Sequence, residues 1–496
     1  MTLRERYPAV GFGTSGVRAL VDDLTPEAVS AYARAFAQAL RADAARSAPR
    51  RAWIGWDLRP SSPAIAAAVC AGLEAEGLEP LLAGPTPTPA LAHAAWREGE
   101  PAVMITGSHI PFDRNGIKFH SAVGEISKAD ERRIAGAEPE RVTLAPDALA
   151  RALARWAERT AHDEAPYAAR VAEAYRERYA RLVPAGALSG LRVGVYQHSA
   201  VGRDLMSALL AELGAGVVPL GRSDAFVPID TEAVSREDEA MAAAWCERHA
   251  LDAVVSTDGD GDRPWVCDER GRFVPGDVVG PLVAAWLGVR GLVTPVSSNS
   301  LVTRMDAFAR VVRTRIGSPY VIEAMAALAR EVTPVAGYEA NGGFLLHHDV
   351  VRDGRTLRAL PTRDALLPIL ALLVESAQRG RPLSALRAEL PPRFTASGRV
   401  QGVDVPRTRA LLAALDEDPS LLERGFGVDG ERLVDVDRTD GLRARFTGGG
   451  RDDELVVHLR MSGNAPELRV YVEDADEDAA ARVRDAVVAA LSGRCR

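Results

Sequence analysis

Three aspartates alternate with glycines in residues 258–263 (DGDGDR), directly after the apolar run 252–257. Interleaved glycines allow a loop to turn several carboxylate oxygens toward one hard cation such as Mg²⁺. A solvated acidic turn is the simplest alternative, but three carboxylates within five residues repel one another without a counter-charge. We therefore expect Asp258, Asp260 and Asp262 to bind a metal ion.

Two other classes of acidic loop fit this segment less well. An EF-hand needs glycine at its sixth loop position, where this chain has Arg263, and it lies between helices rather than after a strand. A phosphatase of the haloacid dehalogenase type needs threonine where Asp262 stands.

A serine follows a second short apolar run. Residues 102–105 predict a strand, and residues 106–111 (TGSHIP) follow it. Ser108 at such a strand-to-turn junction, backed by backbone N–H groups, suits a nucleophile or a phosphate carrier. Ten residues later comes Lys118, whose amine can give or take a proton. Taken alone, the segment fits an ordinary turn about equally well.

A glycine-bracketed loop at residues 337–343 (GYEANGG) offers one carboxylate and one amide, Glu339 and Asn341. Such groups suit paired hydrogen bonds to neighbouring sugar hydroxyls. Taken alone, this segment is better explained as a plain glycine turn.

Residues 460–466 (RMSGNAP) join two predicted strands near the end of the chain. A guanidinium, a hydroxyl, an amide and free backbone N–H groups can surround a phosphate dianion, although a structural hairpin is the competing interpretation. The candidate binding residues are Arg460, Ser462, Gly463 and Asn464. A further glycine-rich loop at 11–18 (GFGTSGVR) ends in Arg18 and lacks the G-K-[ST] of a Walker motif, so it is weak evidence by itself.

The scarcity of lysine and asparagine draws attention to the same loops. Only two of the 60 basic residues are lysines, Lys118 and Lys128, and the chain has only four asparagines. Three of those asparagines and Lys118 fall inside these loops or in the segment 115–118 (NGIK) that follows the serine loop, whereas the presence of Lys128 is best explained by chance.

These loops must be positioned by a larger scaffold, and the chain repeats one pattern three times: strand, amphipathic helix, strand. Such alternation predicts right-handed crossovers and mostly parallel or mixed sheets. Residues 147–182 predict a charged surface helix. The predicted strand, helix and strand are 53–57, 62–76 and 79–83 in the first unit, 192–196, 200–213 and 216–220 in the second, and 292–296, 300–310 and 311–315 in the third.

After residue 392 the pattern changes to strands at 434–446, 454–461 and 467–473, followed by a helix at 479–491. We therefore predict an α/β protein of three similar α/β domains with mixed sheets, plus a smaller C-terminal α+β domain. The predicted ranges are 1–160 (serine loop), 161–276 (aspartate loop), 277–390 (Glu339 loop) and 391–496 (Arg460 loop).

Composition limits the class of protein. With 496 residues, 47% apolar and 26% charged, the chain is expected to be a soluble multidomain protein. Its net charge of −8 argues against a nucleic-acid binder. Its uncharged runs are too short or too rich in proline to span a membrane, and no secretory signal is seen. Four scattered cysteines suit a reducing compartment, so we expect a cytoplasmic protein.

Taken together and in this order, the five loops resemble the α-D-phosphohexomutase family, in its phosphomannomutase/phosphoglucomutase branch. The resemblance covers nearly the whole chain, from residue 11 to residue 466. It implies a heart-shaped molecule in which four domains surround one central cleft.

The resemblance also implies a role for each loop. Ser108 would carry the phosphoryl group, and its oxygen would join Asp258, Asp260 and Asp262 in holding Mg²⁺. Lys118, assisted by Arg18 and His109, would transfer protons, and Arg263 would steady the moving phosphoryl group. The residues implied to bind the sugar and its second phosphate are Glu339, Asn341, Arg460, Ser462, Gly463 and Asn464.

The implied reaction interconverts a hexose 1-phosphate and a hexose 6-phosphate through a 1,6-bisphosphate, which would also act as activator. We favour mannose phosphates, with glucose phosphates as further substrates, and a monomer or homodimer. A phosphoglucosamine mutase and a non-catalytic sugar-phosphate-binding protein on the same fold are the alternatives.

Three loops depart from the family's usual pattern. Gly107 and Ile110 replace alanine and asparagine around the serine, while Asn341 and Asn464 replace a serine and a threonine in the substrate loops. The nucleophile, metal and proton-transfer positions are intact, so these changes bear on the identity of the sugar.

Overall fold

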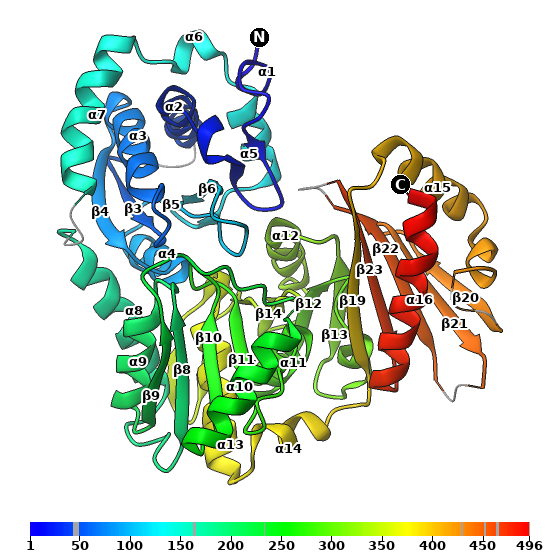
Figure 1. Cartoon of the computed structure of the whole chain (residues 1–496). Helices are drawn as coiled ribbons and strands as arrows, with labels where there is room; N and C mark the ends of the chain where they lie inside the picture. The colour runs from blue at the N-terminus through cyan, green and yellow to red at the C-terminus, as the bar shows by residue number, and fades with distance from the viewer. Residues whose placement is uncertain are drawn as a thin grey trace.

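The computed structural model of the chain describes residues 1–42, 49–161, 165–232, 234–426, 428, 430–450, 453–462 and 466–495. Three α/β units and a C-terminal unit follow one another along the chain, as Figure 1 shows by colour from blue to red. The N-terminal unit lies above the second and third units, and the C-terminal unit lies to one side of them. None of the helices in these ranges combines the length and apolar character needed to cross a bilayer.

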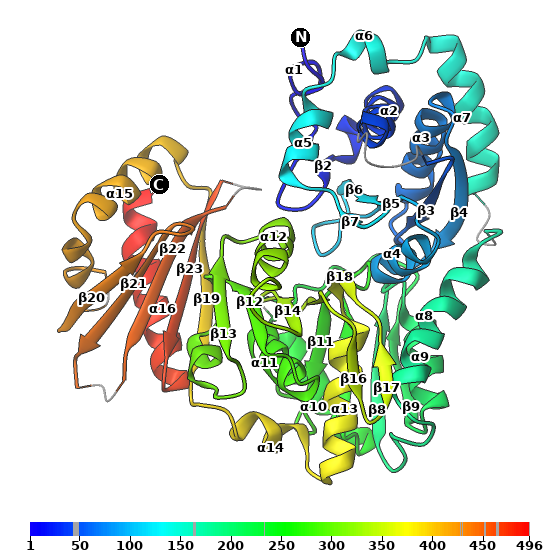
Figure 2. The same ribbon diagram turned by 180° about the vertical axis from the view of Figure 1, so that it is seen from behind.

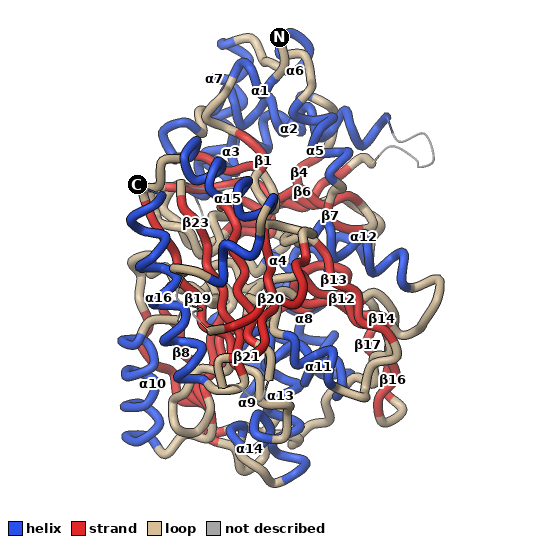
Figure 3. Tube along the Cα trace, turned by 90° about the vertical axis from the view of Figure 1, so that its right-hand side faces the viewer, coloured by secondary structure: helices blue, strands red, loops and turns tan. Residues whose placement is uncertain are grey.

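The first unit is built on a sheet of order β1-β2-β6-β5-β3-β4, with β7 added beside β6. The central strands β4, β3 and β5 are parallel, and β6 runs antiparallel to β5. Figure 3 shows most helices of this unit at the end of the molecule where the N-terminus lies, with α4 nearer the centre. The elements are α1 (Leu3–Arg6), β1 (Gly11–Phe12), β2 (Val17–Leu20), α2 (Pro26–Ala42), β3 (Arg51–Trp56), α3 (Ser62–Ala75), β4 (Glu79–Pro85), α4 (Thr88–Arg97), β5 (Ala102–Ile105), β6 (Arg114–Ser121), β7 (Gly124–Glu125), α5 (Lys128–Ala135), α6 (Pro139–Val142) and α7 (Pro146–Thr160).

The second unit has a four-stranded sheet of order β11-β10-β8-β9, in which only β10 and β11 pair antiparallel. Helix α10 begins at a capping box, where the Ser235 hydroxyl and the Asp238 carboxylate satisfy each other's backbone N–H groups. The elements are α8 (Ala168–Leu182), β8 (Arg192–His198), α9 (Arg203–Glu212), β9 (Gly216–Arg222), α10 (Arg236–His249), β10 (Ala253–Thr257) and β11 (Pro264–Cys267).

The third unit has a mixed five-stranded sheet of order β13-β12-β14-β15-β18 and a small hairpin, β16-β17. The elements are α11 (Gly276–Trp286), β12 (Gly291–Pro295), β13 (Arg310–Thr314), α12 (Ser318–Leu328), β14 (Val335–Tyr338), β15 (Phe344–Leu346), β16 (Val350–Arg352), β17 (Arg355–Leu357), β18 (Leu360–Asp364), α13 (Leu366–Arg379) and α14 (Leu383–Ala388).

The C-terminal unit is an antiparallel sheet of order β19-β23-β22-β21-β20 with two longer helices packed on it (Figure 2). Strands β22 and β23 pair antiparallel, with Arg460 opposite Arg469 and Met461 opposite Leu468. The elements are β19 (Phe394–Gln401), α15 (Val405–Glu417), β20 (Glu431–Asp437), β21 (Leu442–Gly448), β22 (Leu455–Met461), β23 (Glu467–Asp474) and α16 (Glu477–Cys495).

The predicted fold class of three α/β units with mixed sheets and a smaller α+β unit is confirmed, while several predicted elements are wrong in detail. The strand predicted at 434–446 is two strands, because Asp437 Oδ1 accepts a hydrogen bond from Thr439 N and Gly441 adopts φ +80°, which turns the chain. The helix predicted at 300–310 is only a 3-10 turn, Ser300–Arg304, in which Leu301 and the β-branched Val302 are buried in the core.

The single surface helix predicted at 147–182 is two helices, α7 and α8. Helix α8 is not simply a surface helix, because the hydroxyls of Tyr175 and Tyr179 both donate to the buried carboxylate of Asp364 at the end of β18. One apolar core continues from α4 and α8 through the second and third sheets. The predicted domain boundaries themselves stay predictions.

Candidate active site

The aspartate loop connects β10 to β11 in a tight turn closed by the hydrogen bond from Asp258 N to Arg263 O at 3.0 Å. The side chains of Asp258, Asp260 and Asp262 are essentially without solvent exposure, and each offers a carboxylate oxygen within 4.8 Å of the others. Burial, followed by the charges of Asp260 and Asp262, raises the pKa of Asp258 well above its usual value. The three carboxylates predicted to act together therefore form one buried cluster.

The oxygens of this cluster suit a hard divalent cation. Among the described residues, Asp260 Oδ1 and Asp262 Oδ1 are buried and have no hydrogen-bond partner. Their other oxygens are neutralised by Lys118, whose Nζ lies 2.6 Å from Asp260 Oδ2 and 2.6 Å from Asp262 Oδ2. Buried carboxylate oxygens without donors are costly unless a cation binds them, so the residues present fit a metal ion.

Ser108 lies against the same cluster. Its Oγ donates a hydrogen bond to Asp258 Oδ2 at 2.5 Å, and its side chain is fully buried. Its backbone has φ +55°, a left-handed conformation that is unusual for a residue other than glycine. Such strain commonly marks a functional position, and here it turns the hydroxyl toward the aspartate loop.

A buried arginine holds the serine loop in this shape. Arg59, which follows β3, donates hydrogen bonds to four backbone carbonyls of the loop, those of Ser108, Ile110, Pro111 and Arg114, at 2.6 to 2.9 Å. Asp57 receives bonds from Arg59 Nε and from Gly107 N. A Cβ at Gly107 would lie 2.4 Å from Arg59 Cζ, which explains why glycine stands there.

The residues proposed to transfer protons and to steady the phosphoryl group lie around the serine and aspartate loops. Arg18 Nη1 donates to Gly107 O at 2.5 Å, and Arg263 Nη1 donates to His109 Nδ1 at 2.9 Å. Burial, followed by the charges of Arg263 and Arg18, holds the pKa of His109 well below its usual value, so its imidazole is neutral near pH 7. The structure thus brings Arg18, His109, Lys118 and Arg263 to the serine and aspartate loops.

Glu339 joins the site through a residue that the sequence analysis missed. Arg363, at the end of β18, donates from Nη1 to Glu339 Oε2 at 2.8 Å and from Nη2 to Asp262 Oδ2 at 2.7 Å. Asn341 has a structural role, because its Oδ1 accepts from Gly343 N and its Nδ2 donates to Glu232. Glu339 therefore lies one side chain away from the aspartate cluster.

The predicted phosphate loop lies in the C-terminal unit. Arg460 Nε donates to Asp440 Oδ1 at 2.9 Å, and Asp440 Oδ2 in turn accepts from Ile316 N in the third unit. Ser462 N donates to Glu467 O. Gly463 and Asn464 lie outside the described residues, so their prediction stays open.

Four family profiles match in order and cover most of the chain: phosphoglucomutase/phosphomannomutase alpha/beta/alpha domain I over residues 9–139, domain II over 167–271, domain III over 275–394 and the C-terminal domain over 399–490. The chain belongs to the phosphoglucomutase/phosphomannomutase family.

Two curated phosphomannomutases are similar to this family member over nearly their whole length. The protein of Salmonella muenchen is 42% identical over 95% of this chain and 93% of its own, and that of Sinorhizobium fredii is 43% identical over 95% and 96%. A phosphoglucosamine mutase of Frankia alni is 32% identical over 95% of each chain. A solved phosphoglucomutase/phosphomannomutase family protein of Burkholderia thailandensis has the same fold, with a TM-score of 0.69, 22% identity and 97% coverage of both chains.

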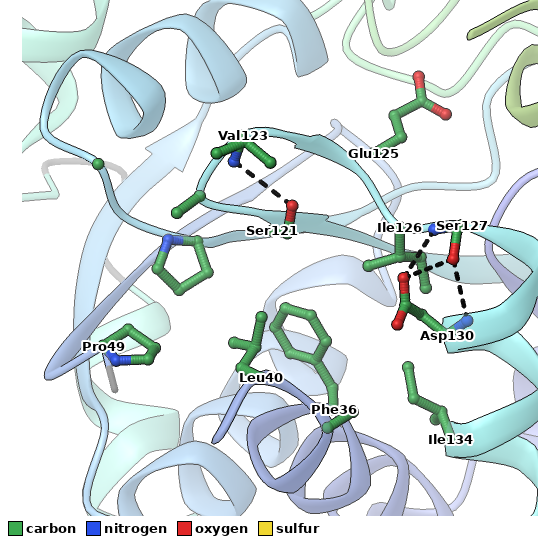
Figure 4. A pocket seen from close by; sticks show the side chains of 14 residues that line it. Phe36, Leu40, Pro49, Ser121, Val123, Glu125, Ile126, Ser127, Asp130 and Ile134 are labelled. Carbon is green, nitrogen blue, oxygen red and sulfur yellow. Dashed lines mark hydrogen bonds between the residues drawn. The ribbon is translucent and has the colours of Figure 1, made fainter. Parts of the chain in front are cut away.

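One cavity of the first unit lies apart from these loops. It measures about 570 Å³ and is lined largely by apolar side chains, among them Phe36, Leu40 and Ile134 (Figure 4). Glu125 also borders it, but its carboxylate accepts hydrogen bonds from Ser318 and Thr362 of the third unit. None of the predicted catalytic residues of this family member lines that cavity, so it is not the catalytic site.

Sequence reasoning missed several residues that support the site. Asp57, Arg59 and Arg363 are buried, and Thr88 at the start of α4 donates from Oγ1 to Asp260 Oδ2 at 2.6 Å. Two of them, Asp57 and Arg59, could have been found from the sequence, because they directly follow an apolar strand. Functional side chains often gather at the carboxyl ends of such strands.

Proposed function

We propose that this enzyme is a Mg²⁺-dependent phosphomannomutase that interconverts mannose 6-phosphate and mannose 1-phosphate. The observation that carries the proposal is the 2.5 Å hydrogen bond between the Ser108 hydroxyl and Asp258 within a buried cluster of three aspartates. A serine on this cluster fits a residue that carries a phosphoryl group. The family membership and the full-length likeness to phosphomannomutases support the same function.

Asp258, Asp260 and Asp262, together with an oxygen of the phosphorylated Ser108, would hold Mg²⁺. The ion, when bound, neutralises negative charge on the transferring phosphoryl group. The unpartnered oxygens of Asp260 and Asp262 support this assignment. Carboxylate oxygens are the ligands that Mg²⁺ prefers in proteins.

In the first half-reaction the bond between Ser108 Oγ and phosphorus breaks, and a bond forms between phosphorus and the free hydroxyl oxygen of the sugar phosphate. Lys118, having first lost its own proton, would accept the hydroxyl proton on its neutral amine, assisted by His109 and Arg18. Arg263, next to Asp258 and Asp262, would steady the moving group. The product of this step is a 1,6-bisphosphate, and positioning with charge neutralisation is the main catalytic need of such a transfer.

In the second half-reaction the bisphosphate, turned end for end, returns its other phosphoryl group to Ser108 Oγ, and the proton returns to the sugar oxygen. We assign Glu339 to the sugar hydroxyls and Arg460, Ser462, Gly463 and Asn464 to the phosphate that does not react. Asn341 would support this loop through its bond to Gly343 N rather than bind the sugar itself. One fixed phosphate site allows the enzyme to act on both ends of the same molecule. We also propose that added hexose 1,6-bisphosphate activates the enzyme by phosphorylating Ser108.

A phosphoglucosamine mutase is the second candidate, supported by the same loops, but the relatives of that name are more distant than the phosphomannomutases. A non-catalytic binder would need neither the buried aspartate cluster nor Lys118. The reactants of the proposed enzyme are small sugar phosphates, and a reducing, cytoplasmic setting suits its four free cysteines.

Phosphorus NMR of the purified protein tests this proposal. Mannose, glucose and glucosamine 1-phosphates are offered separately with Mg²⁺ and a trace of the matching 1,6-bisphosphate. We expect mannose 1-phosphate to be converted fastest to its 6-phosphate, and Ser108→Ala to abolish conversion. Faster conversion of glucosamine 1-phosphate would reassign the substrate, and release of inorganic phosphate would make the enzyme a phosphatase.

A further inference from the structure

A second open cavity lies where the first and third units meet helix α8. It measures about 540 Å³ and is bordered by α4, α8 and the segment from β17 to β18. Figure 2 shows these elements side by side, with α4 next to the upper end of β18 and α8 beside β17. A cavity of this volume is large enough for a small organic ligand.

The lining of this cavity is strongly positive. Arg97 comes from α4, Arg178 and Arg181 come from α8, and Arg358 comes from the segment before β18. Glu177 is the one acidic residue of the described lining, and it is shared between Arg181 at 3.3 Å and Arg97 at 4.0 Å. Asp349, which does not line the cavity, pairs with Arg358 at 2.6 Å. The four guanidinium groups therefore carry two more positive charges than Glu177 and Asp349 together neutralise.

His93 lies among the arginines that line this cavity. It lines the same cavity one helical turn before Arg97. Burial, followed by the charges of Arg178 and Arg97, lowers the pKa of His93 to about 3. The imidazole is thus neutral near pH 7, because burial and, after it, the neighbouring guanidinium groups oppose a further positive charge.

One guanidinium of the lining is incompletely bonded. Arg178 is 6% exposed, and its Nη1 donates to Arg358 O at 2.7 Å. Its Nη2 is buried and has no hydrogen-bond partner among the described residues. The Arg358 carbonyl therefore holds this charged group in place at the wall of the cavity.

We propose that this cavity is a binding site for a small organic phosphate, separate from the proposed catalytic site. Guanidinium groups that converge from three elements match the oxygens of a phosphoryl dianion. The volume exceeds that of a single phosphate ion, and the Trp96 side chain provides an aromatic part of the wall for the organic group. The indole of Trp96 is fixed there, because its Nε1 donates to Ser121 O at 2.7 Å.

Calorimetric titration of the full chain with inorganic pyrophosphate, without Mg²⁺, tests the proposal. The key variant is Arg181→Ala/Arg358→Ala. Both side chains are about three-quarters exposed, so the fold should tolerate their loss, and the Arg358 carbonyl that holds Arg178 is kept. Arg460→Ala removes an arginine of the proposed catalytic phosphate loop, and Arg151→Ala removes an exposed arginine of α7 as a control for the loss of positive charge away from the cavity.

We expect the double variant to weaken pyrophosphate binding at least tenfold, while Arg460→Ala and Arg151→Ala retain a site of wild-type affinity. Loss of all binding in Arg460→Ala alone would place pyrophosphate in the catalytic site and overturn the proposal. Equal weakening in Arg151→Ala would show a general charge effect and also overturn it, as would a double variant that binds like the wild type. Thermal melting of each variant checks that the chain remains folded.

Discussion

Ser108 Oγ donates a 2.5 Å hydrogen bond to Asp258 Oδ2, although the two residues lie 150 positions apart in the sequence. The bond joins a loop of the first sheet to a loop of the second. A phosphoryl group on Ser108 would bring additional negative oxygens to a point where three carboxylates already meet. The serine, the aspartates and their counter-charges therefore form one electrostatic unit, in which Lys118 is the cation now present.

Mg²⁺ should stabilise the folded chain through this unit. A ligand that binds only the folded state at 100 times its dissociation constant adds about 2.7 kcal/mol. We therefore expect Mg²⁺ to raise the melting temperature, EDTA to reverse the rise, and Asp260→Asn to remove most of it. Asp306→Asn, at an exposed loop position, is the matched control and should respond to Mg²⁺ like the wild type. A wild-type melting temperature that is insensitive to Mg²⁺ would contradict the assignment of the metal site.

Lys118→Ala should lower kcat by roughly 10²–10⁴ if the amine transfers the proton of the sugar hydroxyl. Lys118→Arg should not restore the rate, because an arginine side chain does not lose its proton in proteins. Lys128, the other lysine, pairs with Glu131 and provides the control, since Lys128→Ala should keep most of the activity. Steady-state rates with mannose 1-phosphate measure all three variants, and a near-wild-type kcat in Lys118→Ala would remove the proposed role.

The loops that carry chemistry could be predicted from sequence because each is a local signal, a glycine-rich polar segment directly after an apolar strand. Arg59 also follows an apolar strand, but neither Arg59 nor Arg363 lies in a glycine-rich segment, so this signal does not single them out. Each is an ordinary arginine in a chain rich in arginine, and its role depends on partners about 50 to 100 residues away, such as Ser108 for Arg59 and Asp262 for Arg363. The repeating βαβ pattern could also be predicted, because its periodicity is local. The turn within 434–446 was missed, because it depends on one carboxylate, Asp437, and one glycine, Gly441.

Gly107→Ala tests whether Arg59 requires glycine at this position. The added Cβ would lie within 2.7 Å of three atoms of the Arg59 guanidinium, and this group cannot retreat without breaking its bonds to the loop carbonyls. Overpacking of this kind costs about 1–3 kcal/mol. We expect a loss of that size in urea denaturation, together with a lower kcat. Gly124→Ala, where an added Cβ has no neighbour within 4 Å, is the control. Equal stability of the two variants would show that Arg59 adapts.

Arg363 links two carboxylates that the mechanism needs in different roles, Asp262 for the metal and Glu339 for the sugar. Although burial raises the pKa of Asp262, the charges of Arg363 and Lys118 outweigh it and hold that pKa below its usual value. Both Arg363 nitrogens that reach Asp262 contact Oδ2, so Oδ1 stays available to a cation. Arg363 therefore neutralises the aspartate without competing for its free oxygen.

Arg363→Met should therefore lower the stability of the fold and also weaken the binding of the sugar phosphate. Removing one partner of a buried ion pair costs about 3–5 kcal/mol, because the other charge stays buried and unpaired. Arg363→Lys should restore only part of the stability, since one ammonium cannot bridge two carboxylates as a planar guanidinium does. Arg310→Met, which removes one partner of an exposed pair with Glu331, should cost less than about 1 kcal/mol. Urea denaturation measures the free energy of unfolding. The KM for mannose 1-phosphate should also rise, because Glu339 loses its anchor. The KM therefore separates a role of Arg363 in the site from a role in folding alone. If Arg363→Met unfolds no more easily than Arg310→Met and keeps the wild-type KM, the bridge carries neither stability nor sugar binding.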